Sequence, residues 1–318
     1  MKRFKRIVRS TAAGGILASG SWLAGCSTGG LTKAKPTVNA PAYSLVWSDE
    51  FDEPKLDRTK WTPERSCWGG GNNEKQCYTD RPENFKVKDG ILTLIARPEI
   101  FEGHEFSQEK PDRGRIISRN YTSAKLRTLG LAQWKYGRFE ARIKLPQGQS
   151  TWPAFWMLPS DNVYGPWPTS GEIDIMEAIN LAAECDDCES SEVENRTMGS
   201  LHFGPSWPHN KFITKKRSMP ASLEGFNVYA IEWQAGTIKW LVNGQEFFRL
   251  TAQDWSTSDT GSEASDFAPF DQLFYLNLNL AVGGTFPDEH NEARFNPASF
   301  PAQMQIDWVR VFKSTDKN

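Results

Sequence analysis

The sequence has almost no net charge, few cysteines and no long hydrophobic run. Its 318 residues include 37 Lys and Arg against 39 Asp and Glu, a formal net charge of −2. This balance provides neither a basic surface for nucleic acid nor an acidic tail. No stretch holds the roughly 20 consecutive apolar residues that a transmembrane helix needs. Long helical periodicity and internal repeats are also missing, which argues against an all-helical or repeat fold.

Turn-forming and aromatic residues are abundant instead. There are 25 Gly, 19 Pro, 13 Trp and 19 Phe, and most of the chain reads as short extended segments between turns. Asp89-Gly90 and Asn243-Gly244 each stand between apolar segments and predict β-hairpins. Many strands at near-regular spacing, with no helices between them, predict an all-β fold, an antiparallel sandwich or barrel in one domain.

The first 26 residues resemble a bacterial lipoprotein signal peptide. Residues 2–6 are rich in Lys and Arg, residues 7–22 are modestly apolar, and Leu-Ala-Gly-Cys follows, ending at Cys26. In such signals, cleavage before the cysteine leaves it as the lipid-carrying first residue. A plain signal peptide is the alternative. The protein is therefore predicted to cross the inner membrane and to stay anchored by its lipid to the bacterial cell envelope, at the outer membrane or cell surface.

The predicted mature chain has two parts. Residues 27–40 are polar and rich in small side chains, and they predict a flexible tether. Residues 41–315 carry the alternating apolar pattern and predict the folded domain. The lipid is the only membrane contact that this organisation predicts.

Four cysteines remain in addition to the predicted lipidation site. Cys67 and Cys77 flank a Gly-rich loop, and Cys185 and Cys188 belong to a Cys-Asp-Asp-Cys segment. A metal site built from one cysteine pair is weak, because zinc usually takes four ligands. Disulfides or free thiols are therefore favoured, and the sequence leaves the pairing open. The acidic segment 181–196 around the second pair predicts a solvated loop.

Three carboxylates are concentrated in the segment Glu-Ile-Asp-Ile-Met-Glu. In a regular strand, alternate side chains share a face, so Glu172 and Asp174 point one way and Glu177 points the other. A one-residue bulge at Ile175-Met176 would return Glu177 to their face. The alternative is an exposed polar edge strand, but the flanking segments read as buried apolar sheet.

Cleavage of a glycosidic bond needs such a set of carboxylates. One carboxylate attacks the anomeric carbon, and a second, protonated one donates to the leaving oxygen. A separation of ~5–5.5 Å between them leaves no room for water and leads to a covalent intermediate. Asp174, between the other two, can hydrogen-bond the nucleophile and help the acid to keep its proton.

The carboxylate segment resembles the active-site strand of glycoside hydrolase family 16, in its bulged Glu-x-Asp-x-x-Glu form. The preceding Trp-Pro-Ala-Phe-Trp-Met-Leu-Pro segment is similar to the same family, and the resemblance covers nearly all of the predicted mature chain. The loop blocks resemble those of laminarinase-type members. The other matching blocks, in order, lie at 47–52, 70–74, 78–84, 136–142 and 306–311.

The resemblance implies a β-jelly-roll sandwich of two antiparallel sheets with a concave substrate cleft. It implies endo-acting hydrolysis of β-1,3-glucan with retention, with Glu172 as nucleophile, Glu177 as acid/base and Asp174 as the assisting carboxylate. A mixed-linkage glucanase, an agar-type galactan hydrolase or a transglycosylase is the alternative within the family. A non-catalytic carbohydrate-binding sandwich is the alternative outside it, disfavoured because the carboxylate trio is intact.

Further residues are predicted to contact the substrate. Trp152 and Trp156 share a face, because they lie an even number apart, and their rings could stack on sugars or pack in the core. The resemblance places His202 near Glu177, and a satisfied core histidine is the alternative. The remaining candidates are Asn72 and Glu74, for which simple turn chemistry is the alternative, and the weaker Trp207 and Asn279.

The resemblance also implies a structural calcium ion, while the chemistry requires no cofactor. The calcium ligands would be the side chains of Glu50 and Asp307 and the backbone carbonyl of Gly90, since calcium prefers hard oxygen ligands. Ordinary surface carboxylates are the alternative. The predicted partner is a polysaccharide, no nucleic acid is expected, and the chain is predicted to act as a monomer.

Overall fold

The computed structural model describes residues 43–185, 187–188, 191–219, 224–257, 265–290 and 294–315. The predicted signal peptide with Cys26 and the predicted tether lie outside these residues, and both stay predictions. In the described part of the chain, no helix combines the length and the apolar composition that crossing a membrane requires.

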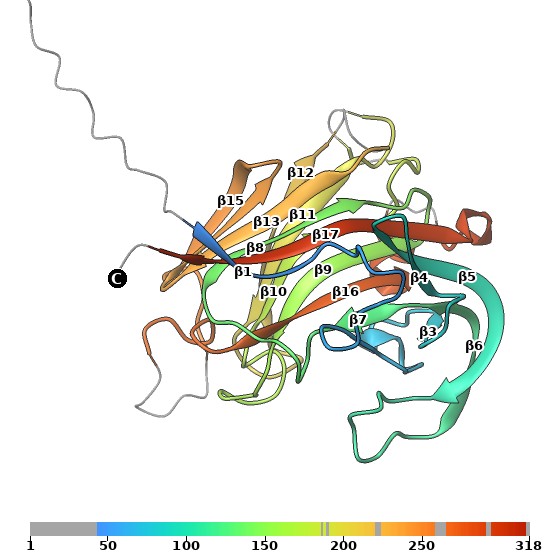
Figure 1. Ribbon diagram of the computed structural model, residues 1–318, viewed down its shortest axis with the longest axis horizontal. Helices are drawn as coiled ribbons and strands as arrows, with labels where there is room; N and C mark the ends of the chain where they lie inside the picture. The colour runs from blue at the N-terminus through green and yellow to red at the C-terminus, as the bar shows by residue number, and fades with distance from the viewer. Residues whose placement is uncertain are drawn as a thin grey trace, which may run out of the picture. The chain divides into compact units, whose positions relative to one another are not determined.

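Two β-sheets pack against each other and make up most of the described chain (Figure 1). The larger, ten-stranded sheet runs, in order, through β15 (Gln245–Thr251), β14 (Thr237–Val242), β13 (Asn227–Gln234), β8 (Gly137–Lys144), β17 (Ala302–Ser314), β5 (Ile91–His104), β6 (Ile116–Ser123) and β3 (Gln76–Tyr78), with β1 (Tyr43–Asp49) on β17 and β4 (Phe85–Lys88) on β5. The smaller, seven-stranded sheet runs through β12 (Lys211–Ser218), β11 (Arg196–Phe203), β10 (Glu172–Glu177), β9 (Thr151–Pro159), β16 (Phe274–Val282), β7 (Lys125–Arg127) and β2 (Thr62–Pro63).

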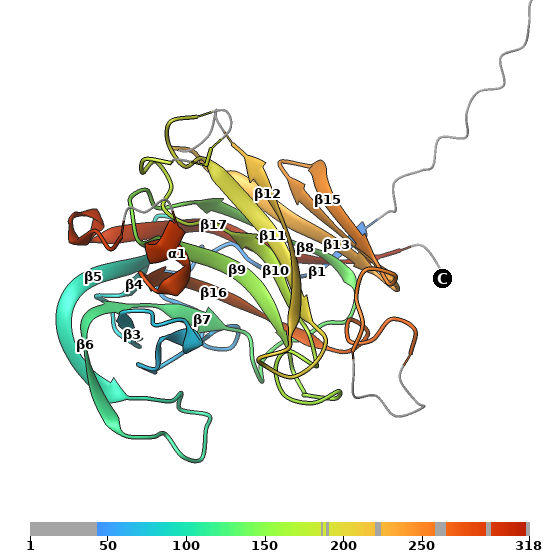
Figure 2. The same ribbon diagram turned by 180° about the vertical axis from the view of Figure 1, so that it is seen from behind.

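The predicted all-β sandwich is confirmed, with one departure in strand direction. The described helical segments are short: α1 (Thr285–Glu289) and 3₁₀ turns at Gly69–Gly71 and Pro297–Ser299. The strands pair antiparallel except that β3 runs parallel to β6. Figure 2 shows the seven-stranded sheet from the side on which α1 lies, with the larger sheet behind it.

Both predicted hairpins form. Lys88 pairs with Ile91 across the first turn, and β14 pairs with β15 across the second. At Asp89-Gly90 the φ angles are 54° and 75°, and Asn243-Gly244 has 50° and 76°. Two consecutive positive φ values define the type I′ turn, whose twist matches that of the flanking strands.

The core between the sheets is rich in aromatic rings. Trp233 of the larger sheet packs edge-on against Phe274 of the smaller one, with ring centroids 5.3 Å apart. Trp240 lies beneath the carboxylate strand, where its Nε1 donates to the carbonyl of Asp174 at 2.7 Å. Gly199 of β11 makes room for this indole, because a Cβ there would meet Trp240 Cδ1 at 2.3 Å. Trp240 therefore helps to fix the position of β10 as well as filling the core.

Candidate active site

Strand β10 carries the three predicted carboxylates and contains the predicted bulge. Against β9, the pairing register shifts by one residue between Asp174 and Met176. Against β11, the register shifts in the same way between Asp174 and Glu177. The extra residue turns Glu177 to the side of Glu172 and Asp174. We call this side of the smaller sheet, opposite the core, the carboxylate face.

His202 lies on β11 directly opposite Glu172. Its Nε2 is 3.3 Å from Oδ2 of Asp174. The two atoms are not aligned as in a regular hydrogen bond, since Asp174 Oδ2 has no hydrogen-bond partner in the described chain. The resemblance placed His202 near Glu177. The strand register sets it across from Glu172 and against Asp174, and its charge also acts on Glu177.

Burial and mutual repulsion raise the proton affinity of this cluster. Burial raises the pKa of Asp174 well above its usual range, and the charges of Glu172 and Glu177 add to the effect. Burial also raises the pKa of Glu177, against the opposing charge of His202 and the hydrogen bond from Trp152. A carboxyl that keeps its proton near neutral pH can act as a general acid.

The same cluster also raises the pKa of His202, although burial opposes the charged form of a histidine. Burial disfavours its charged form, but the contact with Asp174 and the negative charges of Glu172 and Glu177 outweigh burial and raise the pKa of His202 to about 10. His202 is therefore a cation at neutral pH. Its positive charge offsets part of the repulsion among the three carboxylates.

Two indoles hold the outer carboxylates in place. Nε1 of Trp152 donates to Oε1 of Glu177 at 2.9 Å. Nε1 of Trp167 donates to Oε2 of Glu172 at 2.7 Å. Trp167 belongs to the loop between β9 and β10 and was not among the residues predicted from the sequence. The sequence feature that could have pointed to Trp167 is its position five residues before Glu172, in a Pro-Trp-Pro segment.

Trp152 and Trp156 both lie on the carboxylate face and outside the hydrophobic core cluster. Nε1 of Trp156 donates to Asn279 Oδ1 at 2.6 Å, and Asn279 Nδ2 donates to the Tyr78 hydroxyl at 3.2 Å. Tyr78 in turn donates to Glu74 at 3.4 Å. The shared face of the two tryptophans is confirmed, and Asn279 supports the ring of Trp156 from beside it.

Glu74 is buried rather than open to a ligand. Gln76 Nε2 donates to its Oε2 at 2.6 Å, and burial raises the pKa of the Glu74 carboxyl despite that bond. Asn72, by contrast, is exposed, and its backbone carbonyl accepts from the Thr285 amide of α1 at 2.7 Å. The structure therefore places Glu74 under the loop and Asn72 on its surface.

Trp207 is 72% exposed in the loop that follows β11. The neighbouring Ser206 hydroxyl lies 3.4 Å from that of Thr169, which joins this loop to the loop that bears Trp167. Within the described residues, no ring contact or hydrogen bond links the Trp207 side chain to the three carboxylates. The structure thus does not bring Trp207 into direct contact with the catalytic candidates.

The predicted calcium ligands are engaged by arginines. Arg310 donates to both oxygens of Glu50, at 3.0 and 2.7 Å, and Arg142 pairs with Asp307. In the described chain, groups of three or more acidic, His or Cys ligands gather elsewhere: Glu172, Asp174 and His202 form one, and Cys185, Asp187, Cys188 and Glu194 form another. Calcium at Glu50, Gly90 and Asp307 would have to replace both arginine pairs, so this donor set does not fit a ready-made site. The calcium ion is thus an expectation from the resemblance alone, which these arginine pairs do not support.

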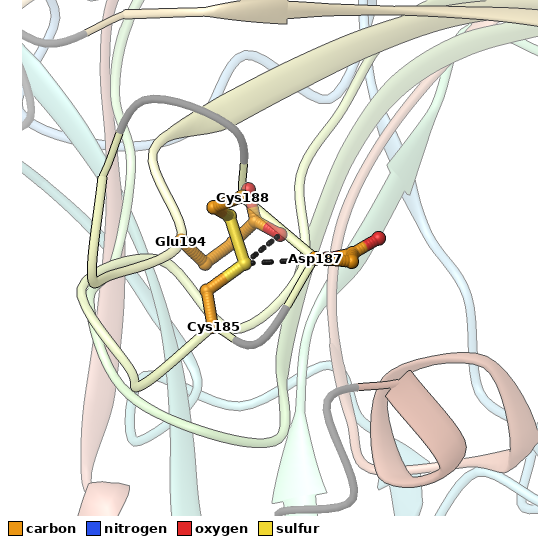
Figure 3. A group of neighbouring side chains, drawn as sticks. All are labelled: Cys185, Asp187, Cys188 and Glu194. Carbon is orange, nitrogen blue, oxygen red and sulfur yellow. Dashed lines mark hydrogen bonds between the residues drawn. A yellow bond between two sulfur atoms is a disulfide. The ribbon is translucent and has the colours of Figure 1, made fainter.

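The four remaining cysteines form two local disulfides, Cys67–Cys77 and Cys185–Cys188. Figure 3 shows the second pair with the carboxylates of Asp187 and Glu194 beside it. The acidic segment departs from the predicted solvated loop at Glu194, which is buried.

A basic pair explains the burial of Glu194. Arg196 donates to Glu194 at 2.6 Å and to Asp187 at 2.7 Å, and His290 Nε2 lies 3.3 Å from Glu194. Although burial opposes it, pairing with Arg196 and His290 lowers the pKa of Glu194 to about 2. The acidic segment is therefore tied to the start of β11 and to the end of α1.

A sandwich of two sheets with a bulged strand that presents two glutamates and an aspartate on one face is the architecture of a glycoside hydrolase. The family model for the GH16 domain of beta-porphyranases A–D matches residues 44–314. The chain belongs to glycoside hydrolase family 16, as its sequence blocks indicated.

Similar proteins include glucanases. Glucan endo-1,3-beta-glucosidase A1 of Niallia circulans is 38% identical over 290 residues, which cover 87% of this chain and 39% of that protein. Beta-glucanase of Rhodothermus marinus is 37% identical over 321 residues, which cover 98% of this chain and 97% of that protein. The X-ray structure of the laminarinase from Rhodothermus marinus matches with a TM-score of 0.71 at 37% identity, covering 87% of this chain and 99% of that one.

Proposed function

We propose that this glycoside hydrolase cleaves β-1,3-glucan within the polymer and retains the anomeric configuration. The observation that carries the proposal is the bulge of β10, which sets Glu177 on the same face as Glu172 and Asp174. The match to a laminarinase over most of both chains supports β-1,3-glucan as the substrate.

The proposed reaction has two steps. Glu172 attacks the anomeric carbon while the glycosidic bond breaks, and Glu177 gives its proton to the leaving oxygen. Glu177 then takes a proton from water, whose oxygen attacks the same carbon and releases Glu172. These carboxylates supply both nucleophile and proton, so the chemistry needs no cofactor.

Neighbouring groups prepare each carboxylate for its role. Trp167 holds the Glu172 oxygen that its indole contacts, and Trp152 does the same for Glu177. The raised pKa of Glu177 favours the protonated form that the first step needs. Loss of the charge on Glu172, as it forms the ester, removes a repulsion and lowers the pKa of Glu177 for its second role as base.

Reducing ends released from laminarin, mixed-linkage β-glucan and agarose test the substrate. The proposal expects the highest kcat/KM on laminarin. Glu172→Gln and Glu177→Gln should each reduce the rate about 10²–10⁴-fold or more, with an unchanged circular dichroism spectrum. Wild-type protein that releases no reducing ends from laminarin would overturn the proposal.

A second candidate substrate is an agar-type galactan. The family model that matches this chain is described for beta-porphyranases, which supports a galactan as the alternative. A higher kcat/KM on agarose would favour this substrate, and a preference for mixed-linkage β-glucan would favour a broader glucanase. Binding of a glycan without release of reducing ends would instead favour a carbohydrate-binding protein.

We further propose that Cys26 carries a lipid that anchors the protein to the cell envelope, and that the domain acts as a monomer. The basic residues and the Leu-Ala-Gly-Cys segment support the anchor. A Cys26→Ser variant should move from the membrane fraction to the soluble fraction, and labelled palmitate should enter the wild type but not this variant. The mass of the purified domain in light scattering tests the monomer.

A further inference from the structure

The short helix α1 has no part in the proposed reaction, although it lies on the carboxylate face of the smaller sheet (Figure 2). It spans only five residues, Thr285–Glu289. An isolated helix shorter than about 12–15 residues is marginal in water, so a helix of this length depends on contacts with the rest of the fold. Those contacts come from both disulfide-bridged segments and from chain next to Trp152 and Glu177.

The first disulfide closes the loop 68–76, which holds the start of α1. The carbonyl of Asn72 accepts the backbone N–H of Thr285 at 2.7 Å. The Lys75 ammonium lies 2.8 Å from Oδ2 of Asp288, further along the helix. This bridged loop therefore contacts α1 through its backbone and through an ion pair.

The second disulfide lies in the acidic segment, which holds the other end of α1. Nε2 of His290, the residue that follows the helix, lies 3.3 Å from Glu194 and 3.6 Å from Asp187. Asp187 lies within the segment that this disulfide closes (Figure 3). Arg196 pairs with the same two carboxylates, so the bridged segment, both acids and His290 form one connected cluster.

The middle of α1 is tied to the chain that carries the acid/base and its indole partner. The carbonyl of Pro287 accepts from Asn180 Nδ2 at 2.7 Å and from Gln149 Nε2 at 3.2 Å. Asn180 comes three residues after Glu177, and Gln149 comes three residues before Trp152. Both amides are buried, so these bonds are shielded from competing water.

One ring of α1 reaches the active site. Phe286 packs edge-on against the Trp152 indole, with ring centroids 5.4 Å apart and planes 71° apart. The same indole donates to Oε1 of Glu177 at 2.9 Å. An edge-to-face contact favours one relative orientation of two rings. Phe286 therefore limits how far the indole can turn away from the carboxylate.

We propose that α1 is a positioning element for the acid/base, in which Phe286 holds the Trp152 indole against Glu177 while the two disulfide-bridged segments hold α1. This inference rests on the proposed function, because it assigns Glu177 the role of acid/base. Phe286 is a positioning residue, since it acts on Glu177 through Trp152.

A Phe286→Ala variant separates positioning of the acid from contact with the substrate. The leaving group of laminarin is a sugar hydroxyl that needs a proton, whereas the dinitrophenolate of an aryl β-1,3-diglucoside leaves without one. We expect kcat/KM for laminarin to fall about tenfold, because a small displacement of a catalytic group is enough for such a loss. On the aryl substrate kcat/KM should stay within about twofold. Phe286→Leu, which keeps most of the bulk, should recover most of the activity on laminarin.

The pH profile supplies a second readout. The hydrogen bond from the indole favours the charged form of Glu177 and so lowers its pKa, and loss of this bond should raise the pKa. The basic limb of kcat/KM for laminarin should therefore move up by about 0.5–1 pH units in Phe286→Ala. The charged groups that face Glu177 from β10 and β11, which are Glu172, Asp174 and His202, are the same in both proteins. Strand β9 and α1 contribute neutral rings.

A variant outside the active site tests the support of α1. Cys185→Ser/Cys188→Ser removes the bridge around Asp187, and it should lower kcat/KM for laminarin about threefold and move the basic limb in the same direction. Phe106→Ala is the matched control. Phe106 is a partly buried ring of the loop after β5, where it contacts Lys110, and its loss should leave both readouts at their wild-type values.

Equal losses on laminarin and on the aryl substrate, or an unmoved basic limb, in Phe286→Ala would overturn the proposal. The ring would then contact the substrate or only stabilise the fold. Wild-type kinetics in the cysteine variant would overturn the role of the second bridged segment. Wild-type protein with no activity on any β-glucan would instead reject the proposed function. The pKa of Glu177, followed by carbon NMR in wild type and Phe286→Ala, would still test the positioning in that case.

Discussion

Glu177 must hold a proton before the first chemical step and release it afterwards. Its partly buried position on the bulged strand raises its pKa, while the hydrogen bond from Trp152 and the charge of His202 limit the rise. The side chain therefore keeps a proton that an exposed glutamate would lose. The same burial that prepares the acid makes its charged form costly to the fold.

Glu177→Gln should remove activity and increase stability. The folded-state pKa is raised above the ordinary 4.5, so the wild type loses stability as the pH rises from about 4.5 through the raised pKa. Glutamine carries no such charge, so the gain in melting temperature should grow over that range. Melting curves from pH 4 to pH 8 measure the gain, with exposed Glu53→Gln as the control. A variant that melts below the wild type at every pH would contradict this account.

His202 should stabilise the fold in a different pH window. Its folded-state pKa is raised from 6.5 to about 10, so its contribution is complete below 6.5 and disappears as the pH rises through 10. The stability difference between wild type and His202→Gln should therefore be largest near pH 6 and small above 10. Urea denaturation across this range measures it, and exposed His209→Gln is the control. A difference independent of pH would argue for a purely steric role.

Sequence patterns predicted the residues of the central strand better than those of the loops. Residue spacing predicted that Trp152 and Trp156 share a face, but only tertiary packing decides that this face lies outside the core. Trp167 was missed because a loop brings it back onto Glu172. Trp207 was a weaker substrate-binding candidate, and its side chain is exposed and separate from the carboxylates.

At the scale of elements, the two disulfides should contribute unequally. Cys67 and Cys77 are buried and ten residues apart, whereas Cys185 and Cys188 are three apart. Chain-entropy arguments give about 3 kcal/mol for the first loop and about 2 kcal/mol for the second. Replacing each pair by alanine and measuring the free energy of unfolding in urea tests this order. A larger loss for the second pair would contradict it.

Local signals predicted the hairpins, because their turns are encoded by adjacent residues. The parallel pairing of β3 with β6 was not predicted, since it joins Gln76 to Tyr121 across a long stretch of chain. The acidic segment was expected in solvent because composition alone does not reveal a partner. Arg196 and His290 supply that partner from β11 and from the end of α1, which explains why Glu194 is buried.

At the scale of the whole molecule, the sandwich depends on large side chains that meet between the sheets. Alternating apolar residues predicted the two layers, while the order of strands within each sheet follows from long-range pairing that no local pattern encodes. Trp240 of the larger sheet donates a hydrogen bond to the smaller sheet at the backbone carbonyl of Asp174. The packing of the larger sheet thereby helps to set the carboxylates of the smaller one.

The predicted calcium ion can be tested on the intact domain. Because Arg310 and Arg142 already neutralise Glu50 and Asp307, we expect the same melting temperature in excess calcium and in a strong chelator. A calcium ion that bound the folded state in place of the arginine pairs would raise the free energy of unfolding. A melting temperature several degrees higher in calcium would show that these carboxylates change partners.

The stereochemistry of the first product tests the paired roles of Glu172 and Glu177 most directly. Proton NMR, recorded within the first minutes of laminarin hydrolysis and before mutarotation, reports the anomer of each new reducing end. Double displacement predicts that the β-anomer appears first. Initial release of the α-anomer would mean direct attack by water, and would contradict the nucleophilic role of Glu172.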